Sequence, residues 1–172
     1  MQKAILISCL ILQLTALFIN AQDTDELKTV FEFHNKVRRS ALSGEIPNQP
    51  KAKEMPELTW NDKLADLAQQ HVDKCVLEKS NLDEVIIGKY DKVGQTVAEH
   101  ESVQKILDTW YNEHKEYKFD QNECSSECGS YKQIVWAATK EIGCGYKLCG
   151  KKATVVCNYA PGAEEGKPYE KA

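Results

Sequence analysis

The cysteines are the residues with the most obvious chemical potential in this chain of 172 residues, which contains seven of them. A cysteine thiolate can act as a nucleophile or bind zinc, and two thiols can be oxidised to a disulfide. Cys124 and Cys128 have a spacing that suits two zinc ligands, but no histidine lies downstream of His114 to complete a Cys-His site. We therefore disfavour zinc and interpret the cysteines as disulfide partners.

Two short runs of acidic residues and histidine are the second candidate for metal chemistry. They occupy residues 99–101 (Glu-His-Glu) and 113–114 (Glu-His). Both fall within 97–117, where apolar residues recur every three or four positions and predict a long helix. Adjacent residues on a helix point in different directions, so neither run can chelate a metal by itself. Solvated surface charges are the preferred interpretation.

The N-terminal residues 1–21 have the pattern of a secretory signal peptide. Lys3 precedes an apolar run, and the small residue Ala21 follows at the expected cleavage position. A membrane anchor is the alternative, but Gln13 and Thr15 interrupt the apolar run, which falls short of the roughly 20 residues that a bilayer requires. The sequence therefore predicts a secreted, extracellular protein without a transmembrane segment.

Cleavage after Ala21 would remove Cys9 and leave an even number of cysteines. An even count in a secreted chain of this size predicts three disulfides and an oxidising destination. No thiol would then remain for nucleophilic catalysis. The six residues are Cys75, Cys124, Cys128, Cys144, Cys149 and Cys157.

Size and charge restrict the remaining classes of function. Residues 22–172 are enough for one domain with a substantial core. The formal charge of the whole chain is −4, and loss of Lys3 makes it −5, because 26 acidic residues then face 21 basic ones. A mildly acidic chain without a basic block is a poor partner for nucleic acid.

The elements that must position any site are two further helices and a small sheet. Apolar spacing predicts helices at 25–43 and 62–75, the second capped by Asn61 and carrying His71 on its buried stripe. Runs rich in β-branched and aromatic residues, bounded by turn residues, predict antiparallel strands within 131–136, 142–146 and 154–159. The resulting expectation is a disulfide-stapled sheet covered by helices.

Short motifs spread in order along residues 22–172 resemble those of the CAP superfamily (cysteine-rich secretory proteins, antigen 5 and pathogenesis-related proteins of the first class). The six-cysteine layout is most similar to that of plant pathogenesis-related proteins and helminth venom-allergen-like proteins. The motifs are Phe33-His34-Asn35-x-x-Arg38, Leu58-x-Trp60, Trp110-Tyr111-x-Glu113, Gly129-x-Tyr131-x-Gln133-Ile-Val-Trp136, Ile142-Gly-Cys144-Gly and Val156-Cys157-Asn-Tyr-x-Pro161.

The resemblance implies an α+β fold for residues 22–172: a single CAP (SCP) domain built as a three-layer α-β-α sandwich around a small, three-stranded antiparallel sheet. It also implies how the cysteines pair, which six cysteines alone leave open among fifteen possibilities. The implied pairs are Cys75–Cys149, Cys124–Cys128 and Cys144–Cys157.

The resemblance further implies a cleft in which relatives hold a divalent metal with two histidines and two glutamates. At those positions this chain has Lys79, Gln95, Glu113 and Ser130, so only one ligand is kept. A lysine ammonium in such a cluster opposes a dication. We therefore expect no metal and no cofactor. In its place we predict an ion pair or close approach between Lys79 and Glu113, with Gln95 or Ser130 donating a hydrogen bond to the carboxylate.

Three classes of function follow. The first is a non-enzymatic lipid carrier, because many relatives bind sterols or fatty acids, and the aromatic loop at Tyr117 and Phe119 is the candidate entrance to an apolar crevice. The second is a protein-binding immune or defence effector that uses the fold as a scaffold. An enzyme is disfavoured, because the residues offer no catalytic triad, metal set or spare thiol.

Overall fold

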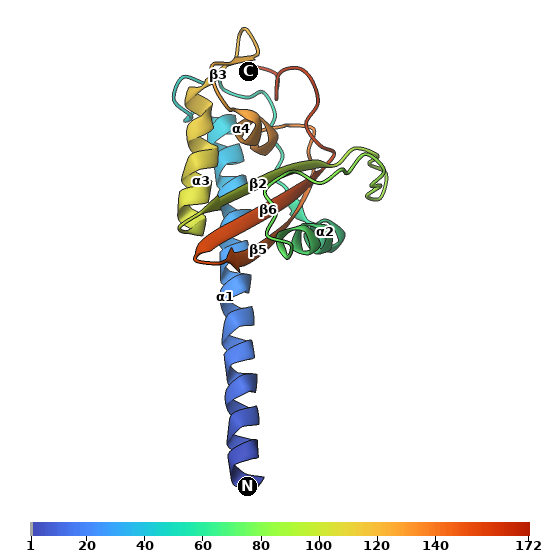
Figure 1. Ribbon diagram of the computed structural model, residues 1–172. Helices are drawn as coiled ribbons and strands as arrows, with labels where there is room; N and C mark the ends of the chain where they lie inside the picture. The colour runs from blue at the N-terminus through green and yellow to red at the C-terminus, as the bar shows by residue number, and fades with distance from the viewer. Residues whose placement is uncertain (1) are drawn as a thin grey trace.

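The structure is a computed structural model that describes the backbone of residues 2–172 and the side chains from residue 23 onward (Figure 1). The predicted signal peptide, residues 1–21, lies outside the part with described side chains. Its residues from Gln2 belong to the long helix α1 (Gln2–Ser43), which projects from the body of the molecule. No helix in the described part combines the length and apolar character needed to cross a membrane.

The centre of the fold is a four-stranded sheet with the order β1-β5-β6-β2. β5 (Glu141–Cys149) and β6 (Lys152–Ala160) form an antiparallel hairpin, and β2 (Gly94–His100) pairs antiparallel with β6. The short β1 (Thr59–Trp60) is parallel to β5, so the sheet is mixed. The predicted α+β architecture is confirmed, although the predicted sheet of three antiparallel strands was incomplete.

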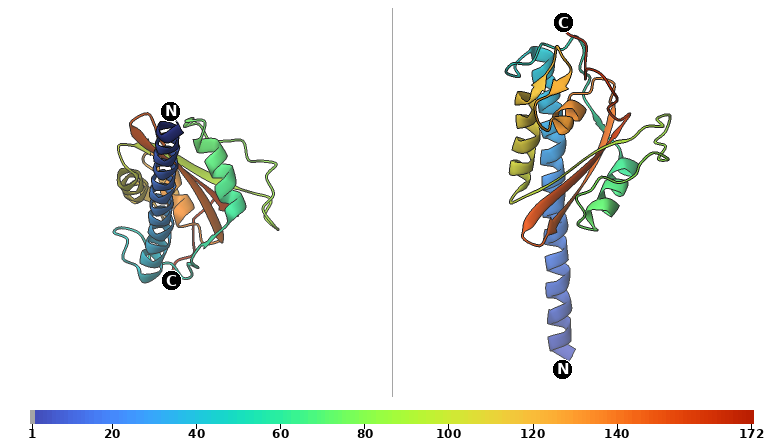
Figure 2. Two further views of the ribbon diagram at one scale, coloured as in Figure 1. Left: turned by 90° about the horizontal axis from the view of Figure 1, so that it is seen from below. Right: turned by 45° about the horizontal axis from the view of Figure 1, so that its top comes forward.

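Helices cover both faces of this sheet (Figures 1 and 2). α2 (Asp62–Val72) packs on one face, against β5 and β6. α1, α3 (Val103–Asn112) and α4 (Gly129–Ile134) lie on the other. This arrangement produces the predicted three layers. The remaining elements are the one-turn 3-10 helix η1 (Glu113–Lys115) and a small hairpin of β3 (Tyr117–Lys118) and β4 (Glu123–Cys124).

Two of the predicted elements have the wrong type. The segment 131–136, expected as a strand, begins within α4, because its buried residues Tyr131 and Ile134 are three apart and share one helical face. The segment 97–100, expected as the start of a long helix, belongs to β2, whose register with β6 is continuous from Gly94 to His100. The hydrogen bonds between β2 and β6 therefore override the helix-like spacing of the apolar residues in this segment.

α2 lies unusually close to β5, and two glycines make this approach possible. A Cβ atom on Gly143 would lie 2.2 Å from the backbone nitrogen of Ala65, and one on Gly145 would lie 2.6 Å from that of Gln69. The helix itself begins as predicted: the Asn61 side chain accepts hydrogen bonds from the first backbone amides of α2. The helix therefore rests directly on the strand backbone.

Arg38 of α1 is fully buried and connects three segments. Its guanidinium donates hydrogen bonds to the backbone oxygens of Pro56, Ile134, Trp136 and Thr139, at 2.8–3.2 Å. Burial lowers the pKa of Arg38 to about 10, which leaves it charged at neutral pH. Among the described side chains no carboxylate pairs with it, so carbonyl dipoles compensate the buried charge.

A second buried network joins α1 to the sheet through His34. Its Nδ1 lies 2.7 Å from the backbone oxygen of Val30, which can only accept, so Nδ1 carries the proton. Nε2 must then accept from the Tyr159 hydroxyl at 2.8 Å, and that hydroxyl is 2.9 Å from Thr96 Oγ1. Burial lowers the pKa of His34 to about 4. The ring is therefore neutral in the folded protein near neutral pH.

This network predicts a loss of stability in acid. The pKa of His34 is near 6.5 in the unfolded chain and about 4 in the folded protein. Between these two pH values the unfolded state therefore binds more protons than the folded state. The contribution of His34 to the free energy of unfolding is complete above about pH 6.5, and about 3 kcal/mol of it is lost as the pH falls towards 4. Urea unfolding of the wild type and of His34→Gln, measured across this range, should show a shallower pH slope for the variant.

The matched control is His100→Gln, which changes an exposed histidine and should keep the slope of the wild type. An equal slope in His34→Gln and the wild type would contradict the assignment of the acid sensitivity to His34.

Candidate functional site

The four positions of the expected cleft do not form one cluster of interacting side chains. Lys79 is exposed on the loop between α2 and β2. It makes no ion pair with any described carboxylate, so the predicted pairing with Glu113 is wrong. In the part of the chain with described side chains, no group of three or more His, Cys, Asp or Glu residues could hold a metal ion. These residues therefore do not fit the metal that the family resemblance implies.

Gln95 has become a structural residue. It is buried on β2, and its Oε1 accepts a hydrogen bond from the Ser80 backbone amide at 2.7 Å. Its Nε2 donates to Asn158 Oδ1 at 2.8 Å, and the Asn158 amide in turn donates to the backbone oxygen of Leu64 in α2. A glutamine can donate and accept at once, which a carboxylate cannot. Gln95 thus ties the loop after α2 to the sheet.

Glu113 also has a partner within the protein. Its Oε2 accepts a hydrogen bond from the backbone amide of Tyr131 at 2.9 Å, in the first turn of α4. Ser130 is the half-buried residue before this amide. A carboxylate at the first turn of a helix is favoured because the amides there lack helical partners. This helix amide therefore stabilises the Glu113 carboxylate, which we expected Lys79 to neutralise.

The aromatic residues Tyr117 and Phe119 are part of the core and do not form an exposed loop. They are 3% and 5% exposed. The Tyr117 hydroxyl donates to Asn122 Oδ1 at 2.8 Å, and burial raises the pKa of Tyr117 to about 12. The Phe119 ring packs against Tyr169, with 4.8 Å between ring centroids. Both side chains are therefore largely buried, and their role at the entrance to an apolar crevice stays a prediction.

Phe119 instead lies at the base of a cavity of about 900 Å³, which we call the lysine-rimmed groove. Four separate segments build it, so spacing in the sequence offered no signal for it. Its lining residues are Lys53, Glu54, Phe119, Trp136, Ala137, Ala138, Lys140, Lys167, Pro168, Tyr169, Glu170 and Lys171.

A second cavity, of about 480 Å³, lies between α2 and the loop that follows it; we call it the α2 groove. Inside it, Ser80 Oγ lies 2.5 Å from Nδ1 of His71, which is buried, as its place on the apolar stripe predicted. The lining residues are Leu67, Gln70, His71, Lys74, Val76, Glu78, Lys79, Ser80, Asn81, Leu82 and Val85.

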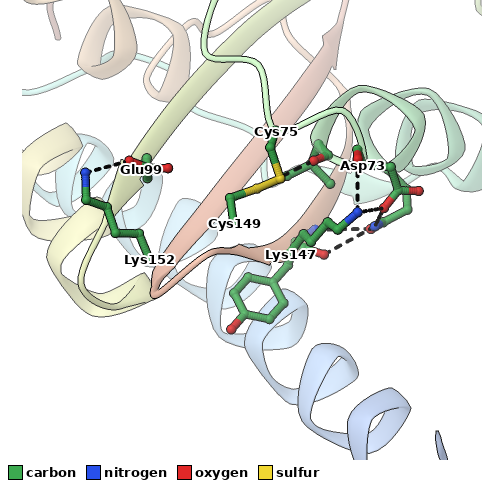
Figure 3. Close-up of a disulfide and its surroundings, with 9 residues drawn as sticks. Asp73, Cys75, Glu99, Lys147, Cys149 and Lys152 are labelled. Carbon is green, nitrogen blue, oxygen red and sulfur yellow. Dashed lines mark hydrogen bonds and ion pairs between the residues drawn. A yellow bond between two sulfur atoms is a disulfide. The ribbon is translucent and has the colours of Figure 1, made fainter.

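The disulfide Cys75–Cys149 fixes the start of this loop to the end of β5 (Figure 3). Beside it, the Lys147 ammonium donates to the backbone oxygen of Asp73 at 3.0 Å and pairs with the Asp73 carboxylate at 3.4 Å. The loop of the α2 groove is thus held at its start by this bridge and at Ser80 by Gln95. The other disulfides are Cys124–Cys128 and Cys144–Cys157, and all three pairs are those that the resemblance implies.

Comparisons with known proteins place this fold in a family. The profile of the CAP family, described as the cysteine-rich secretory protein family, matches residues 31–159. Venom allergen 5 of Vespa velutina is 37% identical over 166 residues, which cover 88% of this chain and 81% of the allergen. GLIPR1-like protein 1 of Mus musculus is 33% identical over 150 residues, which cover 81% of this chain but only 61% of the mouse protein.

A solved structure agrees with these sequence comparisons. Venom allergen-like protein 4 of Schistosoma mansoni superposes with a TM-score of 0.81 at 40% sequence identity. The superposition covers 86% of this chain and 95% of the other.

The burial of Phe119 generates a prediction about stability. Phe119→Ala should lower the free energy of unfolding by about 3 kcal/mol, because it removes a ring that packs against Tyr169 and leaves a cavity. Leu148→Ala is the control, since that side chain is 56% exposed and its loss should change stability by less than about 0.5 kcal/mol. Chemical denaturation measures both, and equal stabilities of the two variants would contradict the core position of Phe119.

Proposed function

The chain belongs to the CAP family of cysteine-rich secretory proteins, and we propose that it is a secreted, non-enzymatic protein that carries a fatty acid or a sterol in the α2 groove. The observation that carries this proposal is the lining of the groove, in which four apolar side chains lie among seven polar or charged ones. The three disulfides support an extracellular destination, because such bonds persist in oxidising compartments.

The walls of the α2 groove suit a hydrocarbon ligand. Leu67 comes from α2, while Val76, Leu82 and Val85 come from the loop. A volume of about 480 Å³ lies within the range of small-molecule sites. Val76 is 39% exposed, so apolar surface that now faces water would become buried when a ligand enters. Burial of this surface provides the driving force for binding.

The polar end of the groove suits the head group of a lipid. The Ser80 hydroxyl and the His71 ring lie side by side there and can exchange a hydrogen bond with a sterol hydroxyl. Lys74 and Lys79 at the rim are exposed cations that can pair with a fatty-acid carboxylate. Lys79, which pairs with none of the described carboxylates, would then bind the ligand.

The same serine and histidine do not support hydrolysis. A serine hydrolase needs a histidine whose second nitrogen is oriented by a third group, commonly a carboxylate. Nε2 of His71 is buried, and no described group forms a hydrogen bond with it. Without an orienting partner the ring is poorly suited to act as a general base, so the pair is better explained as part of a binding site.

Two matched substitutions test the site. Val76 and Leu42 are equally exposed, at 39% each, but only Val76 lines the groove. Val76→Gln should weaken binding of both oleate and cholesterol by about fivefold, because it removes about 1 kcal/mol of apolar contact. Leu42→Gln should leave both dissociation constants unchanged. The measurement is displacement of a fluorescent fatty acid or sterol analogue from the purified protein.

Lys79→Gln separates the two ligand types, since it should weaken the binding of oleate and leave that of cholesterol unchanged. The proposal fails if the wild type binds neither ligand, or if Val76→Gln and Leu42→Gln bind both with the affinity of the wild type.

A further inference from the structure

The lysine-rimmed groove shares no lining residue with the α2 groove. The C-terminal segment 167–171 forms one of its walls, at the end of the molecule opposite the projecting N-terminal part of α1 (Figures 1 and 2). The other walls come from residues 53–54, from Phe119 and from residues 136–140. Any ligand of this groove would therefore bind independently of a lipid beside α2.

The walls of the groove are held in place by hydrogen bonds that are present without a ligand. The Ala137 amide donates to the Pro168 oxygen at 2.8 Å, and the Lys53 amide donates to the Glu170 oxygen at 2.9 Å. The Tyr169 hydroxyl donates to the backbone oxygen of Pro50 at 2.9 Å. A surface that is already ordered loses little conformational entropy on binding.

The floor of the groove is apolar. Phe119, Trp136 and Tyr169 are 5–8% exposed. The ammonium groups of Lys167 and Lys171 lie over the Phe119 ring, 5.5 and 5.6 Å from its centroid. Ala137, Ala138 and Pro168 complete this surface. A partner that fills the groove must therefore bring some apolar side chains, which a purely polar polyanion does not have.

The rim of the groove is basic, on a chain whose formal charge is −4. Four lysines and two glutamates line it, a charge of +2 that becomes +1 when Asp120, the ion-pair partner of Lys171, is included. Two of the lysines, Lys140 and Lys167, have no carboxylate within ion-pair distance among the described side chains. The rim is thus complementary to a negatively charged partner.

The other two lysines have carboxylate partners that a ligand can replace. Lys53 pairs with Glu170 at 3.0 Å, and Lys171 pairs with Asp120. The side chains of Glu170 and Asp120 are 78% and 68% exposed. Exposed ion pairs of this kind contribute little to stability. A carboxylate from a bound partner could therefore take the place of either one at small cost.

From this combination we propose that the lysine-rimmed groove is a docking surface for a segment of a second extracellular protein in which acidic and apolar side chains alternate. The acidic side chains would reach the rim lysines, and the apolar ones would fill the floor. A flat membrane surface would touch the rim but could not reach the concave floor. A sulfated polysaccharide would satisfy the lysines but would leave the apolar floor without a partner.

The test uses a short fluorescein-labelled peptide of alternating Glu and Leu, with fluorescence anisotropy as the readout on the full disulfide-bonded protein. Lys140→Gln combined with Lys167→Gln should weaken binding about tenfold, since the two rim lysines that form no ion pair with a described carboxylate are lost. Glu170→Gln should strengthen binding about threefold, because it removes the carboxylate that competes for Lys53. Affinity should fall as the salt concentration rises.

Lys63→Gln combined with Lys115→Gln is the matched control, because both lysines are exposed and neither lines the groove. This control should bind like the wild type, and a peptide of alternating Gln and Leu should bind weakly to every variant. Three outcomes would overturn the proposal: no binding of the Glu-Leu peptide at low salt, equal losses in the groove and control variants, or retention on heparin that depends on Lys140 and Lys167 without peptide binding.

Discussion

The buried charge of Arg38 is the constraint on which much of this structure depends. A guanidinium removed from water requires several hydrogen-bond acceptors, and Arg38 finds four backbone carbonyls in segments distant from α1. Three of these belong to Ile134, Trp136 and Thr139, where the chain leaves α4 and approaches β5. The position of this turn sets one wall of the lysine-rimmed groove. A residue in the interior of the fold therefore determines the shape of a surface that it does not reach.

A comparable dependence links the opposite face of the sheet to the α2 groove. Gly143 and Gly145 allow α2 to lie directly on β5, and the loop after the helix must then return across the sheet to reach β2. The Cys75–Cys149 bridge and the contact between Ser80 and Gln95 hold this return path. Because the loop is held at these points, Val76 and Leu82 stay beside α2, while Ile87 is buried against Leu64.

Two of the positions that the family resemblance matches to metal ligands have structural partners in this protein. Gln95 donates and accepts hydrogen bonds between the loop and the sheet, and Glu113 accepts a hydrogen bond from the first turn of α4. Both side chains therefore have structural roles that require no metal ion. Lys79, which forms no ion pair among the described side chains, is exposed beside the α2 groove.

The sequence by itself determined the features that arise from local patterns. These are the start of α2 at Asn61, the strand segments 142–146 and 154–159 and, through the family resemblance, the cysteine pairs. Tertiary structure decided the rest. Residues 97–100 became a strand because β6 offered hydrogen bonds along its whole edge, and Tyr131 entered a helix whose first turn Glu113 stabilises. Both grooves combine residues from distant segments, and the burial of Phe119 depends on Tyr169, fifty positions later in the chain. Spacing along a chain encodes the period of a helix or strand, but contacts between distant segments depend on how those elements pack.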